Sequence, residues 1–162
     1  MGLCYEINYF YRCSNNNLMS RVKIIIPERI PDYKTTLSIR VTDINYGNHL
    51  ANDKLVALLH ESRVLMLSAW GYTEFDVEGV SLIQADLMVS YQNEGFLGDQ
   101  LSFALYLTNF TSRSFDLLYH ISTIRAGQVL TIAMAKVGLV CFDYVHKKTI
   151  SIPAAFTQKF SP

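Results

Sequence analysis

The chain has 162 residues, half of them hydrophobic and 17% charged, so it can bury the core of one domain and lies outside the composition of disordered proteins. Its formal net charge is zero and it has no basic stripe, which argues against a nucleic-acid partner. No apolar stretch is long enough to predict a membrane span, and three cysteines without a repeated spacing predict neither a disulfide framework nor a metal site and favour a reducing, cytoplasmic location.

The first part of the chain looks unlike the rest. Residues 1–18 show no clean hydrophobic period and contain the asparagine run Asn15–Asn17. We expect them to be a poorly ordered extension or an artefact of an upstream start, with residues 19–162 forming a single domain. An added edge strand at Val22–Ile26 is an equal alternative.

A regular pattern begins after that. Thr36–Thr42 alternates apolar and polar residues, which predicts a half-buried strand, and Asp43–Asn48 has the composition of a loop. The apolar run Lys54–Trp70 predicts a helix that Asn52 or Asp53 can cap and that ends at the following glycine. Since this helix is apolar nearly all round, we expect it to be buried on most sides.

The remainder reads as strand after strand. Four are predicted, namely Ser81–Tyr91, Gln100–Phe110, Phe115–Ile124 and Val129–Tyr144. Pro153 limits the last segment, Ile150–Phe160, to coil or a final helical turn. One curved antiparallel sheet wrapped around one long helix, an α+β fold, accommodates all of these elements. Its outer face and edge strand, together with a slightly positive mean hydropathy, favour pairing with a second copy.

The junction between loop and helix carries a family resemblance. The segment Arg40–Asp53 and the later step His60–Arg63 resemble the motif of hotdog-fold thioesterases, in the branch of 4-hydroxybenzoyl-CoA thioesterase-like and acyl-CoA thioesterases. Gly98-Asp99 and Cys141–Tyr144 give weaker matches, and the resemblance covers roughly residues 35–160. It implies a hotdog fold, hydrolysis of acyl-CoA or acyl carrier protein thioesters, and a homodimer or dimer of dimers. It implies no cofactor other than coenzyme A as part of the substrate.

One departure from the family concerns the acid. Many members have an aspartate where this chain has Asn45, and an amide can act neither as nucleophile nor as base. Other members use a glutamate on the central helix, and Glu61 stands at that place. Its helical neighbours are apolar, so we expect a poorly hydrated carboxylate with a raised pKa, suited to a general base. The structural alternative for Glu61 is an ion pair with Arg63 or with a cation of a neighbouring subunit.

The start of the helix supplies the electrophilic part of the predicted site. Free backbone N–H groups there can polarise a thioester carbonyl, and Asn45 and His49 can each add a donor. As alternatives, Asn45 is a turn residue and His49 orders the loop. Asn52 is expected to contact substrate or to cap the helix, and Asp53 is a reserve base or a dipole-stabilising residue. Asp43 is expected to hold the loop through backbone amides or the neighbouring arginine.

The phosphates of coenzyme A need cations and hydrogen-bond donors. By resemblance, Ser112, Arg113 and Ser114 are the first candidates, and Lys147 and Lys148 are the second. Ordinary solvated surface is the alternative for both groups.

The acyl group needs a dry slot. Leu58 and Leu65 on the helix and strand residues near Met88 are its expected lining, with plain core packing as the alternative for each. The leading prediction is therefore a thioesterase in which Glu61 activates water. The rival is a module that binds or senses acyl-CoA without hydrolysing it, which Asn45 favours.

Overall fold

The structure is a computed structural model that describes residues 22–160, so the predicted boundary at residue 18 lies outside the described residues. The elements in chain order are β1 (Tyr33–Ser38), a short 3-10 helix (Val41–Asp43), α1 (Asn52–Ala69), β2 (Ser81–Tyr91), β3 (Gln100–Thr108), β4 (Ser114–Arg125), β5 (Gln128–Asp143), β6 (Lys148–Thr149) and α2 (Ala154–Phe160). The long helix and the four strands after it were all predicted, and the bounds of β2 agree with the prediction.

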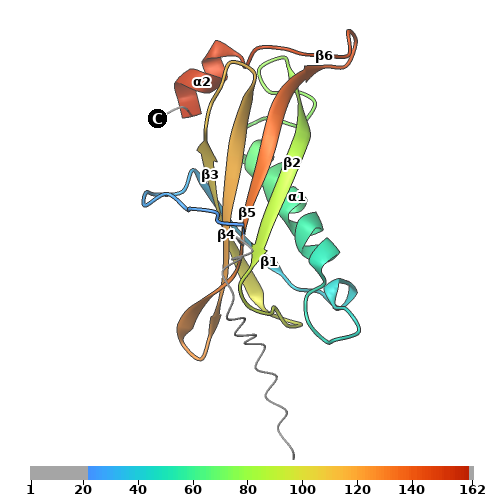
Figure 1. Ribbon diagram of the computed structural model, residues 1–162, viewed down its shortest axis with the longest axis vertical. Helices are drawn as coiled ribbons and strands as arrows, with labels where there is room; N and C mark the ends of the chain where they lie inside the picture. The colour runs from blue at the N-terminus through green and yellow to red at the C-terminus, as the bar shows by residue number, and fades with distance from the viewer. Residues whose placement is uncertain (1–21, 161–162) are drawn as a thin grey trace, which may run out of the picture.

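The strands form one antiparallel sheet in the order β1-β3-β4-β5-β2, and β6 adds to β5 (Figure 1). β4 and β5 form a long hairpin that closes between Arg125 and Gln128. Its two turn residues, Ala126 and Gly127, have φ angles of 48° and 77°, and a two-residue hairpin turn of type I′ requires positive φ at both positions. β1 and β2 are the two outer strands of this order, so among residues 22–160 β2 pairs only with β5.

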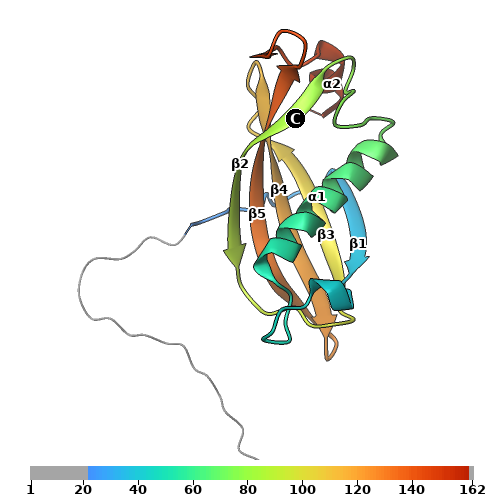
Figure 2. The same ribbon diagram turned by 90° about the vertical axis from the view of Figure 1, so that its right-hand side faces the viewer.

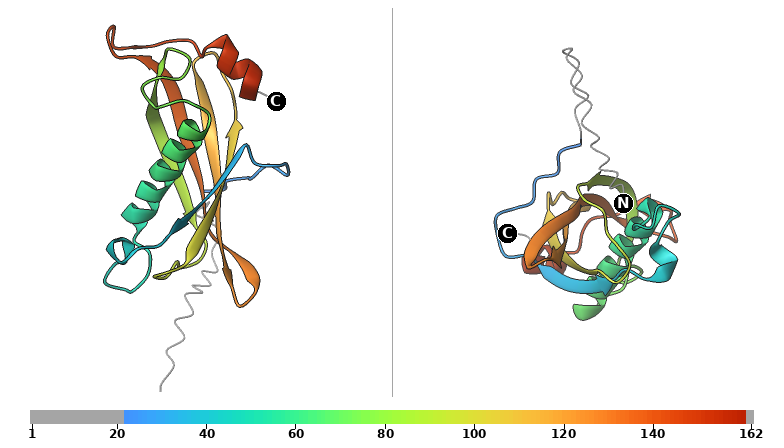
Figure 3. Two further views of the ribbon diagram at one scale, coloured as in Figure 1. Left: turned by 180° about the vertical axis from the view of Figure 1, so that it is seen from behind. Right: turned by 90° about the horizontal axis from the view of Figure 1, so that it is seen from below.

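The sheet curves around α1, which lies along its concave face (Figures 2 and 3). The helix buries five apolar side chains in the core, those of Leu55, Leu58, Leu59, Met66 and Leu67. The sheet supplies the inward residues of its central strands, including Phe103, Leu105, Leu117, Tyr119, Ala133 and Ala135. The predicted architecture of one helix inside a curved antiparallel sheet is confirmed.

The far side of α1 is less buried than we predicted. Val64 and Leu65 are 44% and 37% exposed, because the sheet reaches only one face of the helix. The apolar residues on that face are therefore open to solvent in a single chain.

Two segments near the start of the domain differ from their predictions. β1 ends at Ser38 instead of Thr42, because the N–H of Asp43 donates to the carbonyl of Arg40 (3.0 Å) and turns the chain into the 3-10 helix. Residues 22–27 form no strand. They run across the convex face of the sheet, where Ile24 and Ile26 pack against outward side chains.

The C-terminal segment forms the helical turn that was one of the two predicted outcomes. α2 places Phe156 in the core, where its ring lies 5.3 Å from that of Phe115 and 6.0 Å from that of Tyr72. Between residues 22 and 160, neither helix has the combination of length and apolarity that a membrane crossing requires.

Candidate functional site

The loop before α1 is held in one shape by its own hydrogen bonds. The N–H of Asn45 donates to the carbonyl of His49 (3.0 Å), and that of Asn48 donates to the carbonyl of Asn45 (3.1 Å). The side-chain oxygen of Asn45 accepts from the N–H of Gly47 (2.8 Å). A Cβ on Gly47 would lie 2.9 Å from the His49 ring, so only glycine allows this close packing. Asn45 therefore has the turn role that we considered, and it still presents its amide nitrogen.

That amide nitrogen lies beside the imidazole. Asn45 Nδ2 is 3.3 Å from His49 Nδ1, which is also 3.3 Å from the carbonyl oxygen of Leu50. The two contacts need opposite tautomers, since Nδ1 must accept in the first and donate in the second. His49 thus has two possible hydrogen-bonding states, and both side chains are half-buried at the edge of the loop.

Asp43 holds this loop in place, as predicted. Its buried carboxylate accepts from the backbone N–H and the Nε of Arg40 at 2.9 and 3.1 Å. Burial alone would raise the pKa of Asp43, but the hydrogen bonds and charge of Arg40 outweigh it and lower that pKa. The carbonyl of Asp43 also accepts from the N–H of Ala51 (2.9 Å), which ties the loop to the start of α1.

The start of α1 carries no side-chain cap. Ala51 takes the N-cap position with extended backbone angles, and no side chain of the described residues caps it. The predicted capping role of Asn52 is therefore wrong, because the helix already includes this residue. The first N–H groups of a helix have no partner within it, so those of Asn52 and Asp53 are available to a ligand. The helix dipole adds a partial positive charge at the same point.

A cavity of about 270 Å³ opens beside this helix start. It is lined by His49, Leu50, Asn52, Leu55, Tyr91, Gln92, Asn93, Glu94, Gly95 and Ile132. The phenol oxygen of Tyr91, at the end of β2, lies 3.5 Å from the carbonyl oxygen of Asn52. Burial and the nearby charge of Asp53 raise the pKa of Tyr91, so this hydroxyl stays protonated and can donate. Tyr91 could not be identified from the sequence, because 39 residues separate it from Asn52 and no local spacing links the two.

Glu61 lies elsewhere on the helix. Nine helical residues separate it from Asn52, so the two side chains project about 180° apart. Glu61 borders a second hollow with Arg40 and Leu58, on the β1 side of the helix, and its carboxylate is 3.9 Å from Arg40. Its side chain is 44% exposed, so the expected burial of this carboxylate is wrong for a single chain.

An ion pair of Glu61 with Arg63, one of the structural alternatives, is not formed. Arg63 is almost fully buried and donates from Nε to Glu74 (2.7 Å) and from Nη1 to Gln84 (3.1 Å). Glu74 also lies 3.0 Å from His60 Nε2. No signal in the sequence indicated this cluster, because its members come from α1, the following loop and β2.

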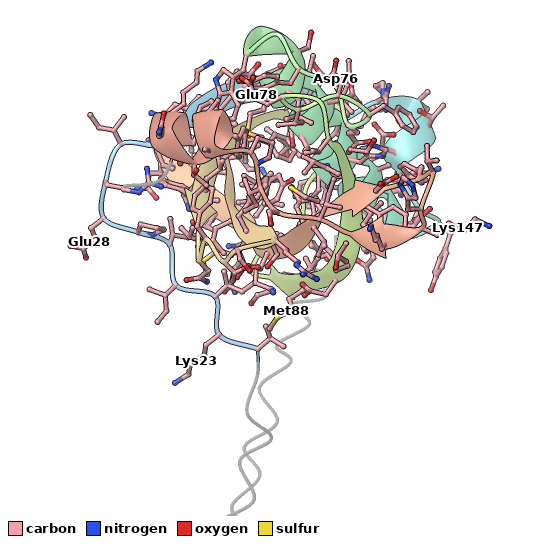
Figure 4. The ribbon with its side chains drawn as sticks, turned by 90° about the horizontal axis from the view of Figure 1, so that it is seen from above. Lys23, Glu28, Asp76, Glu78, Met88 and Lys147 are labelled. Atoms are coloured by element: carbon pink, nitrogen blue, oxygen red, sulfur yellow. The ribbon has the colours of Figure 1, made fainter. Side chains whose placement is uncertain are left out.

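The expected acyl-slot residues are scattered. Leu58 is a buried core residue beside the hollow of Glu61, and Leu65 faces solvent. Met88 pairs with Lys136 on the convex face of the sheet and points away from α1 (Figure 4). Of the three, none lines the cavity at the start of α1, whose apolar walls come from Leu50, Leu55 and Ile132.

The predicted phosphate-binding residues lie at the other end of the sheet. The N–H of Cys141 donates to the carbonyl of Arg113, whereas the N–H of Asn93, in the cavity wall, donates to the carbonyl of Ile132. Nine residues of β5 separate Cys141 from Ile132, a distance of about 30 Å in a strand. Arg113 is exposed, with Nη1 3.1 Å from the Thr149 hydroxyl.

The two serines beside Arg113 take part in the same turn. Ser114 Oγ is 2.8 Å from Thr111 Oγ1, and the carbonyl of Ser112 accepts from the N–H of Ile152. One chain alone therefore does not bring Ser112, Arg113 and Ser114 to the cavity. The described residues also contain no group of three or more His, Cys, Asp or Glu side chains placed to hold a metal ion.

A protein-family model matches most of this chain. The sequence model described as the thioesterase-like superfamily matches residues 39–160. This range includes the loop, α1 and the whole sheet except β1. No curated protein sequence matches the chain.

Solved structures with the same fold are numerous, and their sequences are distant. A 1,4-dihydroxy-2-naphthoyl-CoA thioesterase from Synechocystis is 17% identical, with a TM-score of 0.69 over 78% of this chain and 93% of that one. A 4-hydroxybenzoyl-CoA thioesterase, an aspartate-to-asparagine mutant in complex with 4-hydroxybenzoyl-CoA, is 15% identical, with a TM-score of 0.71 over 80% and 98%. A thioesterase-superfamily protein from Jannaschia is 16% identical, with a TM-score of 0.69 over 78% and 79%. The fold is therefore the hotdog fold that the sequence predicted.

Proposed function

Because this chain belongs to the thioesterase-like superfamily, we propose that it hydrolyses acyl thioesters at the start of α1. Superfamily and fold support thioester hydrolysis in general. The observation that carries the proposed location is the uncapped helix start, which opens on the cavity beside His49 and Tyr91. Coenzyme A is the proposed carrier of the acyl group, and acyl carrier protein is the alternative.

The helix start is the proposed oxyanion site. Water adds to the thioester carbonyl carbon, and the carbonyl oxygen becomes an anion that accepts hydrogen bonds from the N–H groups of Asn52 and Asp53. His49 lines the same cavity and can donate to the same oxygen, and the amide nitrogen of Asn45 lies beside it, 3.3 Å from His49 Nδ1. The carbon–sulfur bond then breaks, and the leaving thiolate takes up the proton that water gave to the base.

Two carboxylates, on different sides of the helix, are candidates for the general base that activates water. Glu61 is the residue proposed from the sequence, and in a single chain it can reach only a substrate bound on the β1 side of α1. Asp53 stands in the first turn, near enough to Tyr91 for its charge to raise the pKa of that phenol. Asp53 follows Asn52, which lines the cavity, so Asp53 is the proposed base within one chain, and Glu61 is the base if a second copy supplies the carbonyl-binding groups.

We propose that the complete site is shared between two copies. Arg113 lies about 30 Å from the cavity wall along the sheet, so only a second copy can bring it to coenzyme A bound there. No strand within the described part of the chain pairs with the outer edge of β2, and the exposed side of α1 carries Val64 and Leu65. Both features favour association with another chain, either as a homodimer or as a dimer of dimers.

The second candidate function is binding of acyl-CoA without hydrolysis. Asn45 favours it, since an amide stands where many members of the family have the catalytic aspartate. The 4-hydroxybenzoyl-CoA thioesterase structure is itself that of an aspartate-to-asparagine mutant in complex with 4-hydroxybenzoyl-CoA. An asparagine and a bound acyl-CoA are thus compatible in this fold.

A panel of acyl-CoA substrates with detection of the free thiol separates the two functions. Turnover of at least one substrate, lost in His49→Ala while that variant remains folded, would support hydrolysis. Calorimetric binding without release of thiol across the panel would support the binding module. Absence of both binding and turnover, with acyl-CoA and with acyl carrier protein, would contradict the proposed site.

A further inference from the structure

The segment before β1 crosses the convex face of the sheet, on the side opposite α1 (Figures 1 and 3). We call residues 22–32 the strap. Its Ile24 and Ile26 pack against Ala104, Tyr106 and Leu118, which form an apolar cluster separate from the main core. These three residues point outward, because they alternate along β3 and β4 with the buried residues that face the helix. The strap thus covers the apolar part of a face that the rest of the fold leaves open.

Two charged side chains fasten the strap where it leaves the edge of the sheet. The N–H of Asp32 donates to the carbonyl of Leu105 (2.9 Å), which is the last backbone contact of this edge. Beyond it, the N–H of Leu107 donates to Asp32 Oδ2 (2.7 Å), and Arg29 Nη2 donates to the carbonyl of Leu107 (2.9 Å). The carboxylate and the guanidinium therefore occupy the two positions that a neighbouring strand would fill.

Arg29 and Asp32 also bind each other, and Arg29 contacts the apolar cluster. Arg29 donates from both terminal nitrogens to Asp32, at 2.9 and 2.8 Å, in the bidentate geometry that is strongest for this pair. The guanidinium carbon also lies 5.5 Å from the centre of the Tyr106 ring. By contrast, Lys23 and Glu28 in the same strap project away from the protein (Figure 4). Arg29 and Asp32 are therefore the charged residues that hold the strap to the sheet.

We propose that the strap is an intramolecular cover, latched by Arg29 and Asp32, that keeps a second copy of this chain from docking on the convex face. An uncovered apolar face beside an unpaired strand end is a template for association. A second copy is the occupant, because releasing the strap would expose the same apolar cluster and the same β3 edge on every chain, which is what a two-fold symmetric contact requires. Assembly would then be confined to the other surfaces, including the β2 edge.

The test uses the full chain and does not depend on thioesterase activity. Arg29→Ala and Asp32→Ala are compared with wild type and with the control Glu28→Ala, which removes a charge from the strap without touching the latch. Hydrogen exchange at the Leu107 amide reports the latch, and light scattering reports the mass of the assembly. Both latch variants should exchange this amide about tenfold faster, because Asp32→Ala removes the acceptor of the Leu107 N–H and Arg29→Ala removes the group that holds this acceptor in place, and both should double the mass. Wild type and Glu28→Ala should keep the slow exchange at Leu107 and the lower mass.

Two results would overturn the proposal. Unchanged exchange at Leu107 in both variants would show that the pair is no latch, and faster exchange with the wild-type mass would show that the strap keeps no second copy away. If Arg29→Ala does not fold, Arg29→Lys provides the same test, because it keeps the charge and loses the bidentate contact. Adding Leu118→Glu to Arg29→Ala should restore the wild-type mass. A mass that stays doubled would mean that the copies associate at another surface, which would also contradict the proposal.

Discussion

The two ends of α1 both hold polar groups against an apolar core, and they differ in how those groups are paired. In the second half of the helix, Arg63 is buried and bound to Glu74 and Gln84. At the start, no side chain of the described residues caps the N–H groups of Asn52 and Asp53, and Asn52 lines a cavity. Buried polar groups normally find partners within the protein, as those of Arg63 do, so the paired end serves the fold. Asn52 and Asp53 are exposed, so their N–H groups are open to water or to a ligand.

The largest effect should come from the paired end. Arg63→Met leaves Glu74 without its buried cation, and breaking one partner of such a pair costs about 3 kcal/mol of the free energy of unfolding. Urea denaturation measures this cost. Arg113→Met makes the same chemical change on the surface and should alter stability by no more than about 0.5 kcal/mol. Equal stability of the two variants would mean that the cluster does not support the fold.

The next effect tests whether the start of α1 is the site of hydrolysis. If Asp53 activates water at the helix start, Asp53→Asn should lower kcat/KM about 100-fold, while Glu61→Gln should leave it unchanged. The reverse outcome would move the chemistry to the β1 side of the helix and require a second copy to complete the site. Full activity in both variants would contradict every mechanism proposed above. Binding of acyl-CoA should survive in each variant.

The sequence indicated the fold better than it indicated this difference between the two ends. The bounds of β2 followed from a run rich in apolar residues that ends before the chain-breaking residues 93–95. β1 was predicted as residues 36–42 and is Tyr33–Ser38, because the pattern through Thr42 could not show that the chain turns at Arg40, where the Asp43 carboxylate binds. Local periodicity therefore predicted the strands, and a side-chain contact decided where one of them ended.

The orientation of α1 was the part that sequence reasoning could not resolve. A helix that is apolar nearly all round has no readable buried face, so Glu61 was assigned to a dry environment that the sheet does not provide. The cavity and Tyr91 were missed for a different reason, since they depend on bringing β2 against the helix start. The loop motif around Asn45 and His49 was found, because its residues are consecutive in the chain.

A smaller effect is expected from restoring the acid that this loop lacks. In Asn45→Asp the new carboxylate can still accept from the Gly47 N–H, so the loop should keep its shape. We expect kcat to rise about tenfold, or a measurable rate to appear if wild type only binds. Asn48→Asp adds the same charge at an exposed neighbouring position and should have no such effect. An equal gain in both variants would point to general electrostatics instead of a positioned acid.

The smallest expected effect is the pH dependence of the stability that Glu74 contributes at the paired end of α1. Burial alone would raise the pKa of Glu74, but the hydrogen bonds and charges of Arg63 and His60 outweigh it, so the pKa in the folded chain lies below the ordinary value of 4.5. A lowered pKa favours folding of the ionised form, so this contribution is complete above pH 4.5 and is lost as the pH falls through the folded pKa. Glu74→Gln should therefore flatten the loss of stability in acid, measured as urea midpoints between pH 7 and about 3. Glu28→Gln, on the exposed strap, should keep the wild-type slope. The same slope in all three proteins would mean that the proton on Glu74 is not coupled to the Arg63 cluster, and the contrast between the two ends of α1 would then rest on geometry alone.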